Sequence, residues 1–189
     1  MIPLYLIYFQ YMKEKRKGAL GTKGILEVLI FSDSHGAYRQ MRRVIENHPC
    51  ASHVLFCGDG LRDVEALEKD FPKQVFVSVK GNCDGLLSYY DAPYERLFTL
   101  GELRVLMMHG HTHGVKGGYG VAAAYAASQG ATILLFGHTH LPCEGKISIG
   151  NEEIHFFNPG SIGCAYGSAP SYGVLTVKEN GYLFSHGTI

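Results

Sequence analysis

The sequence contains no tryptophan, no Cys-x-x-Cys pair and no apolar run long enough to cross a bilayer. Charged residues make up 18% of its 189 residues, too few for a disordered chain, and the 46% of hydrophobic residues suffices for a packed core. Its five cysteines are an odd number, so they predict neither a disulfide framework nor a zinc knuckle. These absences exclude a membrane-spanning, collagenous or coiled-coil protein and favour a single domain in a reducing cytoplasm.

The chain also lacks an excess of charge of either sign, with 17 basic and 17 acidic residues. The balance conceals an asymmetry, because residues 1–24 hold five of the basic residues and one acid, which leaves 12 basic and 16 acidic residues in the remainder. A net negative remainder gives no electrostatic basis for a dedicated nucleic-acid surface.

Residues 1–24 are interpreted as an N-terminal extension that precedes a domain at 25–189. Their apolar stretch, residues 2–9, is too short to span a membrane, and the charges follow it, whereas a signal peptide has them first. Three roles stay open: a non-essential extension, a segment that docks on the domain or on a partner, and a weak membrane contact.

From residue 25 onward, short apolar runs alternate with stretches of helical character, which is typical of an α/β fold. The runs predict strands covered on both faces at 25–31, 54–57, 75–79, 105–108 and 133–136. Helices are predicted between them at 38–47, 62–69 and 119–128.

The last third of the chain has a different pattern. Four strands are predicted at 144–149, 153–157, 171–177 and 182–186, and the Gly-Asn and Asn-Gly pairs between them indicate hairpins. A parallel first half followed by an antiparallel second half predicts two sheets packed together and flanked by helices, a four-layer α-β-β-α sandwich.

Residues able to bind metal follow five of the predicted strands. They are Asp33, His35, Asp59, Asn82, His109, His138 and His140. Because ligands bind at the carboxyl ends of strands in open α/β sheets, these side chains are expected to converge. Their nitrogen and oxygen atoms suit Mn, Fe, Zn, Co or Ni ions, and seven ligands suit two divalent ions that share a carboxylate better than one ion with an open position.

The motifs Asp33-Ser34-His35-Gly36, Gly58-Asp59, Gly81-Asn82-Cys83-Asp84, His109-Gly110-His111 and Gly137-His138-Thr139-His140, followed by Asn158-Pro159-Gly160-Ser161, stand in one order along residues 25–189. In these motifs the sequence resembles the calcineurin-like metallophosphoesterases, and within them the small single-domain branch of YfcE-type phosphodiesterases and Vps29. The resemblance implies a β-sandwich with a two-metal site at one edge.

The same resemblance implies a role for each ligand. Asp33, His35 and His140 would hold the first ion, Asn82, His109 and His138 the second, and Asp59 would bridge them; manganese is the expected metal, with Ni, Fe, Zn or Co as alternatives. His111 and His113 are candidates for contacts with ligands or substrate, or are plain loop residues. The Asn158–Ser161 segment is either a structural turn or a support whose amide and hydroxyl orient a ligand loop or a phosphate.

The implied reaction is in-line attack of a bridging hydroxide on a phosphodiester, with Asp59, Asn82, Cys83 and His111 as the catalytic set. Many members of the family carry histidine at the position of Cys83, and a thiol is a poorer proton donor at neutral pH. We therefore expect a small phosphodiester or nucleotide-like substrate with a good leaving group, unless His111 substitutes.

Two alternatives stay open. One is a non-catalytic protein-interaction scaffold like Vps29, and the other is a phosphomonoesterase or nucleotidase. The oligomeric state is open as well, a homo-oligomer included. The other four cysteines, Cys50, Cys57, Cys143 and Cys164, are expected to be buried or partly buried.

Overall fold

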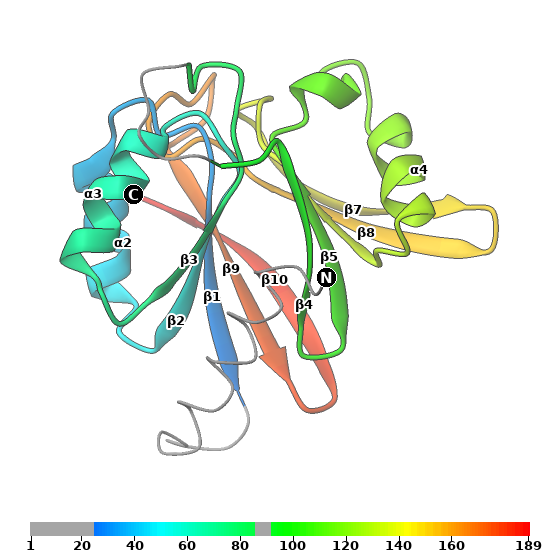
Figure 1. Cartoon of the computed structure of the whole chain (residues 1–189), viewed down its shortest axis with the longest axis horizontal. Helices are drawn as coiled ribbons and strands as arrows, with labels where there is room; N and C mark the ends of the chain where they lie inside the picture. Colours follow the sequence, from blue (N-terminus) through cyan, green and yellow to red (C-terminus); the bar gives the residue numbers. More distant parts are fainter. Residues whose placement is uncertain (1–24, 86–91) are drawn as a thin grey trace, which may run out of the picture.

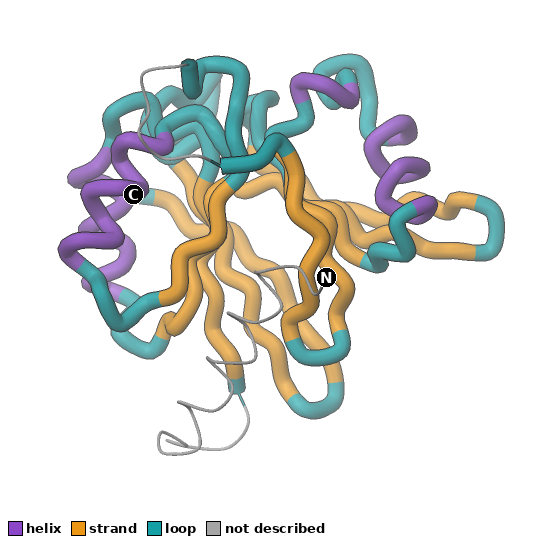
Figure 2. Tube along the Cα trace, in the orientation of Figure 1, coloured by secondary structure: helices purple, strands orange, loops and turns teal. Residues whose placement is uncertain are grey.

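The computed structural model describes residues 25–85 and 92–189, which form two five-stranded sheets packed face to face (Figures 1 and 2). The first sheet has the order β10-β9-β1-β2-β3, built from Gly181–Thr188, Ser171–Lys178, Leu26–Phe31, Ala51–Phe56 and Val75–Ser78. The second has the order β4-β5-β6-β8-β7, built from Glu95–Leu100, Leu103–Met108, Ile133–Leu135, Glu152–Pro159 and Pro142–Ile149. The extension predicted at 1–24 lies outside the described residues.

In the described part of the chain, three α-helices cover the outer faces of the two sheets. The helices α2 (Tyr38–Asn47) and α3 (Leu61–Asp70) lie on the first sheet, and α4 (Gly120–Ser128) lies on the second, as Figure 1 shows. Each turns a small apolar face inward at helical spacing, for example Met41, Val44 and Ile45 in α2. The predicted four-layer α/β sandwich is therefore confirmed.

The main core lies between the sheets. It contains fully buried side chains such as Ile30 of β1, Leu55 of β2 and Val105 of β5. The strands β1, β2 and β6 are covered on both faces, which is why their sequences read as continuous apolar runs instead of alternating ones.

Three expectations about the strands are corrected. The strand β4 was not predicted, because its burial pattern is that of a partly exposed edge strand with Glu95, Arg96 and Thr99 among its residues. β2 begins at Ala51 instead of Val54. The second half is not purely antiparallel, since β8 pairs in parallel with β6 while β4 and β5 form an antiparallel pair in the middle of the chain.

The cysteines are free thiols, and two of them depart from expectation. Cys57 is buried and Cys143 half-buried, but Cys50 and Cys164 are exposed. Cys50 follows Pro49 in the turn before β2, and Cys164 lies in the loop between β8 and β9. Neither position faces a core.

Within residues 25–85 and 92–189, no helix is both long and apolar enough to cross a membrane.

Candidate metal centre

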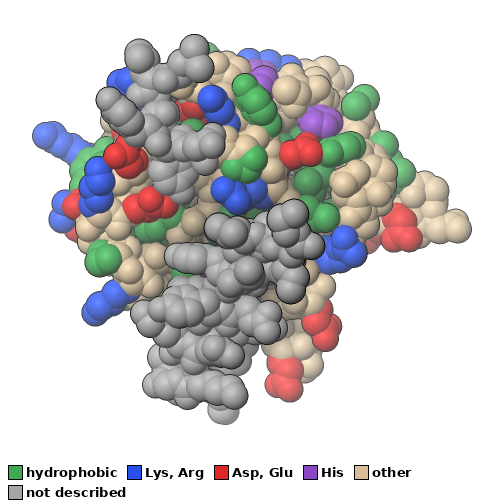
Figure 3. Space-filling view, in the orientation of Figure 1, with side chains coloured by type: hydrophobic (Ala, Val, Ile, Leu, Met, Phe, Trp, Pro, Cys, Tyr) green, Lys and Arg blue, Asp and Glu red, His purple; other side chains and the backbone are tan. Residues whose placement is uncertain are grey.

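The predicted ligands lie at the edge where the carboxyl ends of both sheets meet. Asp33 follows β1, Asp59 follows β2 and Asn82 follows β3, all neighbouring parallel strands of the first sheet. His109 follows β5 and the pair His138 and His140 follows β6, neighbouring parallel strands of the second sheet. The loops of this edge gather at the top of the molecule in Figure 2, where histidine side chains reach the surface in Figure 3.

The backbone at this edge is strained. Among the described residues, five that are not glycine have a positive φ, and all five are predicted ligands: Asp33, His35, Asp59, His138 and His140, with φ between 44° and 65°. Each costs about 1–2 kcal/mol relative to the right-handed region. Such strain collects at functional sites, where the fold holds side chains in orientations that relaxed loops would not give.

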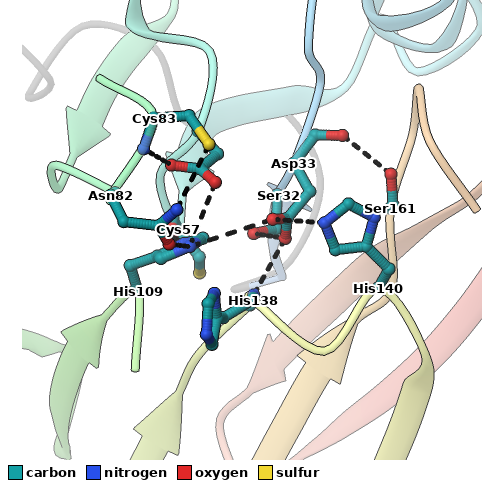
Figure 4. A network of polar contacts seen from close by, with 12 residues as sticks. Ser32, Asp33, Cys57, Asn82, Cys83, His109, His138, His140 and Ser161 are labelled. Atoms are coloured by element: carbon teal, nitrogen blue, oxygen red, sulfur yellow. Dashed lines mark hydrogen bonds and ion pairs between the residues drawn. The ribbon is translucent and has the colours of Figure 1, made fainter. Parts of the chain in front are cut away.

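The side chains converge on the two buried aspartates, Asp33 and Asp59. Figure 4 shows His109 and His140 around Asp33. Asp33 Oδ1 lies 3.2 Å from His140 Nε2 and 3.9 Å from the Nε2 atoms of His35 and His109. Asp59 Oδ2 lies 3.4 Å from His109 Nε2 and 4.0 Å from His35 Nε2. Three groups have donor atoms within 4.8 Å of one another: Asp33 with His35 and His140, Asp33 with Asp59 and His109, and His35 with Asp59 and Cys83.

Two backbone carbonyls orient the central histidines. His109 Nδ1 lies 2.8 Å from the carbonyl oxygen of Cys57, and His140 Nδ1 contacts the carbonyl oxygen of Cys164. A carbonyl oxygen only accepts, so Nδ1 carries the proton in each neutral ring. The Nε2 lone pairs are thereby directed at the aspartates, the arrangement in which imidazoles ligate metals.

The electrostatics of the buried groups are coupled. Burial raises the pKa of Asp59, but the adjacent His109 imidazole and the amide of Cys83 outweigh burial, so the net pKa is lowered. Burial lowers the pKa of His109, and the carboxylates of Asp59 and Asp33 reverse this to a net rise. The Asp33 carboxylate also raises the pKa of His140. The site therefore stabilises positive charge between its two carboxylates.

The remaining predicted site residues line the site. Asn82 Oδ1 lies 3.1 Å from His109 Nε2, and Asn82 Nδ2 donates to Cys83 Sγ at 3.2 Å. The His138 amide donates to Asp33 Oδ2 at 3.0 Å, while its ring lies 4.9 Å from that of His109. The His138 imidazole is absent from the three donor groups found among the described residues.

His111 and His113 differ in their surroundings. The His111 ring is 5.4 Å from that of His109 and 6.1 Å from that of His138, so His111 borders the site. The His113 ring instead lies 4.8 Å from that of Tyr125 on α4. Burial and the charge of His109 lower the pKa of His111.

Sequence reasoning assigned no role to Asp84, although it belongs to the Gly-Asn-Cys-Asp motif. Its buried carboxylate accepts hydrogen bonds from the amides of Asp59, Gly60, Leu61 and Gly81 at 2.7–2.9 Å. One side chain thus joins the loop after β2 to the loop after β3. The sequence signal for Asp84 was an acidic residue at the end of a motif that contains a predicted ligand, Asn82.

Asp63, in the first turn of α3, was missed as well. Its Oδ2 accepts from Ser34 Oγ at 2.6 Å and from the amide of Gly36 at 2.9 Å, so it holds the loop that carries His35. Nothing in the local pattern distinguishes Asp63 from an ordinary helix-start acid.

The Asn158–Ser161 segment supports the ligand loops, the second of its two predicted roles. Asn158 Nδ2 donates to the carbonyl of Gly137 at 2.9 Å and to Thr139 Oγ1 at 3.0 Å. Ser161 Oγ donates to the carbonyl of Asp33 at 2.7 Å. The segment therefore ties the end of β8 to both the β1 and β6 loops.

The residues present fit a divalent metal. Within the described residues, Asp33 Oδ1 is buried without a hydrogen-bond partner, although it faces three imidazoles. Leaving a buried carboxylate oxygen unpaired is costly unless a cation satisfies it. The absence of a side chain at Gly137 leaves space beside the Asp33 carboxylate. A Cβ at position 137 would lie 2.7 Å from Asp33 Oδ2 and 1.8 Å from Ser32 Oγ.

Comparison with known proteins gives the family. The sequence model of the calcineurin-like phosphoesterase superfamily domain matches residues 26–180. The chain is 32% identical over 162 residues to "Probable metallophosphoesterase YsnB" of Bacillus subtilis (strain 168), covering 82% of this chain and 86% of that protein. It is 29% identical over 173 residues to "Phosphodiesterase YfcE" of Escherichia coli (strain K12), covering 80% and 88%.

Solved structures agree on the fold. A conserved protein of Streptococcus pneumoniae TIGR4, described as a predicted phosphoesterase, superposes with a TM-score of 0.70 at 25% identity, covering 88% of this chain and 91% of that one. Vacuolar Protein Sorting 29 from Cryptosporidium parvum superposes with a TM-score of 0.66 at 18% identity, covering 88% and 99%. The chain therefore belongs to the calcineurin-like phosphoesterase superfamily. Within that class it falls in the small branch that contains YfcE and the Vps29-like structures.

Proposed function

We propose that this protein is a divalent-metal-dependent phosphodiesterase with a two-metal site. The observation that carries the proposal is the pair of buried carboxylates, Asp33 and Asp59, that face the Nε2 atoms of three histidines while Asp33 Oδ1 has no hydrogen-bond partner among the described residues. Asp33, His35 and His140 would hold one ion, Asn82, His109 and His138 the other, and Asp59 would be shared. When bound, two such ions supply an activated water and neutralise charge on the phosphoryl oxygens.

The chain's own residues prepare this chemistry by orientation. The carbonyls of Cys57 and Cys164 hold the protons of His109 and His140 on Nδ1, so that each Nε2 faces the site. The Asp84 carboxylate fixes the loops that present Asp59 and Asn82 before substrate arrives. A site that is organised in advance pays little reorganisation cost when charge develops on the phosphoryl group.

Cys83 is proposed as one donor of the proton that the departing alkoxide needs. Burial and the Asp59 carboxylate raise the pKa of its thiol to about 11, so the thiol remains protonated at neutral pH. A donor with so high a pKa assists poorly, which supports a preference for aryl leaving groups of low pKa; the sugar hydroxyl of a nucleoside has a higher pKa and would depend on a better donor. His111, beside His109, is the other candidate donor.

Manganese is the proposed metal, with Ni, Fe, Zn or Co as alternatives, because nitrogen and oxygen donors without a required thiolate accept all of them. The five free thiols support a reducing compartment such as the cytoplasm. The 29% identity to YfcE, which is named a phosphodiesterase, supports the diester over the monoester. The Vps29 structures keep the interaction scaffold as the second candidate, because they share the fold.

The test is metal-dependent hydrolysis of bis(4-nitrophenyl) phosphate beside 4-nitrophenyl phosphate, with wild-type and Asp59→Asn protein. Chelation is expected to abolish diester cleavage and Mn²⁺ to restore it, whereas Asp59→Asn lowers turnover at least a hundredfold with unchanged circular dichroism. Asp70→Asn, which removes an exposed aspartate on α3, is the matched control and retains full activity.

Each other outcome decides between the candidates. Faster cleavage of the monoester would make the protein a phosphomonoesterase. Normal turnover by Asp59→Asn would remove the two-metal site. Inactivity of the wild type with every divalent metal would leave the scaffold.

A further inference from the structure

Two exposed tyrosines adjoin the candidate metal centre. Tyr94 is 55% exposed and Tyr166 is 60% exposed, and they are the only aromatic residues among the exposed large hydrophobic side chains of the described chain. Folded proteins cover most aromatic rings, so exposed rings collected at one site indicate a binding surface.

The two tyrosines adjoin different histidines. The Tyr166 ring, from the loop between β8 and β9, stacks on His140 with centroids 4.7 Å apart and an angle of 20°. The Tyr94 ring, directly before β4, lies 5.7 Å from that of His111, which in turn borders His109 and His138. Figure 4 shows His109 and His140 on either side of Asp33. Tyr166 therefore adjoins a first histidine group, His35 and His140, and Tyr94 adjoins a second, His109, His111 and His138.

Each ring has surface left for a ligand. Tyr166 uses one face on His140 and is still largely exposed, so its other face is open. A flat group stacked there would continue the ring column of His35, His140 and Tyr166, in which His35 and His140 are 5.2 Å apart. Tyr94 carries Lys80 Nζ at 5.9 Å from its ring centroid, a cation placed to meet an anionic substrate. Flat aromatic surfaces interleaved with cations are the means by which proteins bind nucleotides without reading their sequence.

We propose that Tyr94 and Tyr166 are specificity-determining residues that stack the two organic groups of the substrate, and that the substrate is a phosphodiester joining two flat rings, of the dinucleoside monophosphate class. This inference rests on the proposed function for the position of the phosphorus, between the two histidine groups. Beyond the proposed function, it specifies the two organic groups that the phosphate joins: both are flat rings.

A purely structural role for Tyr166 makes a different prediction. If the ring only covers His140, its removal disturbs a histidine that every substrate depends on, and all substrates lose turnover alike. If the ring stacks substrate, its removal weakens binding of flat groups and leaves aliphatic diesters unchanged. Phenylalanine variants keep the ring in both cases and serve as matched controls.

The first experiment measures binding without turnover. Saturation-transfer difference NMR is recorded with thymidylyl-(3′→5′)-thymidine and with dibutyl phosphate on chelated wild-type protein, Tyr94→Leu, Tyr166→Leu and the two Phe variants. The base protons are expected to receive saturation in the wild type and the Phe variants, and to lose at least half of it in each Leu variant. The butyl signals stay equal throughout. Absent base saturation in the wild type, or equal saturation in the Leu variants, overturns the inference.

The second experiment uses Mn²⁺-loaded protein with bis(4-nitrophenyl) phosphate and methyl 4-nitrophenyl phosphate. Replacing both tyrosines by leucine is expected to raise KM for the bis-aryl ester about tenfold, with kcat within about twofold and a smaller effect on the methyl ester. Equal loss of kcat for both esters overturns the inference in favour of a cover on His140. Tyrosine-dependent base saturation in a wild type that hydrolyses nothing would disprove the proposed catalysis and leave the stacking sites standing.

Discussion

At the residue scale, the proposed proton donor Cys83 lies beside a carboxylate. Cys83 takes the position next to Asn82, its amide donates to Asp59 Oδ1 at 2.7 Å, and its thiol pKa is raised to about 11. A thiol so close to a carboxylate resists ionisation, because the thiolate would face another negative charge. The Cys83 thiol therefore stays protonated at neutral pH and is a weak acid.

Replacing Cys83 by histidine is expected to speed hydrolysis of diesters with poor leaving groups about tenfold or more, because imidazole titrates near neutral pH and donates a proton more readily. The measurement is the ratio of kcat/KM for alkyl over 4-nitrophenyl esters in Cys83→His and wild type. Cys50→His, at an exposed cysteine far along the chain from the motif, is the control. An unchanged ratio would place Cys83 outside the proton path.

Proton binding at His109 is expected to set the pH dependence of metal binding. Its pKa in the metal-free protein is raised above 6.5 by the carboxylates of Asp59 and Asp33, against the effect of burial. A metal needs the neutral imidazole, so protons compete with it, and apparent metal affinity should rise as pH increases through the raised pKa and fall below it. Calorimetric titration with Mn²⁺ at a series of pH values measures this. An affinity that does not change with pH would contradict the assignment of His109 as a ligand.

At the scale of elements, side-chain hydrogen bonds join the loops that carry the site residues to one another and to neighbouring elements. The loop after β2 and the loop after β3 share Asp84, and the loop after β1 is held by Asp63 of α3 and by Ser161 after β8. These ties maintain the positive φ values of Asp33 and Asp59, which relaxed loops would abandon.

Asp84→Ala is expected to lower the free energy of unfolding of the chelated protein by about 3–5 kcal/mol, because it leaves four backbone N–H groups near the site without their acceptor. Urea denaturation monitored by circular dichroism measures the loss. Asp70→Asn removes an exposed ion pair with Arg42 and is expected to cost less than about 1 kcal/mol. Equal effects of the two substitutions would show that Asp84 does not hold the loops.

At the scale of the whole molecule, the candidate metal centre joins the two sheets. Asp33 and Asp59 come from the first sheet and His109 and His140 from the second, and the Nδ1 of His109 meets the carbonyl of Cys57 across the seam. A bound cation would add bonds between the two sheets, since ligand atoms of Asp33 and Asp59 from the first and of His109 from the second lie within 4.8 Å of one another.

Metal binding is therefore expected to stabilise the entire fold. At a concentration 100 times its Kd, a metal adds about 2.7 kcal/mol, which for a chain of this size raises Tm by about 5–10 °C. Differential scanning calorimetry of chelated and Mn²⁺-loaded protein measures the shift. Asp59→Asn is expected to lose most of it, and a full shift in that variant would locate the metal elsewhere.

The fold class and the candidate ligands could be predicted from the amino-acid pattern. Buried strands such as β1 and β6 read as continuous apolar runs, and their carboxyl ends carry the aspartates and histidines, because a strand that is covered on both faces leaves only its ends for chemistry. The local pattern thus predicted which side chains meet, since parallel neighbours end at a common edge.

Tertiary structure alone decided what surrounds those ligands. The exposed edge strand β4, the parallel pairing of β8 with β6, the contacts of Asp63 and Asp84, and the carbonyls of Cys57 and Cys164 all depend on which distant segments lie side by side. The same holds for Tyr94 and Tyr166, whose rings contact site histidines from two segments that are far apart in the sequence. The periodicity of side chains along the sequence indicates which face of a single helix or strand is buried. The contacts above form between two elements that are distant in the sequence. Which elements become neighbours is decided only when the two sheets pack together.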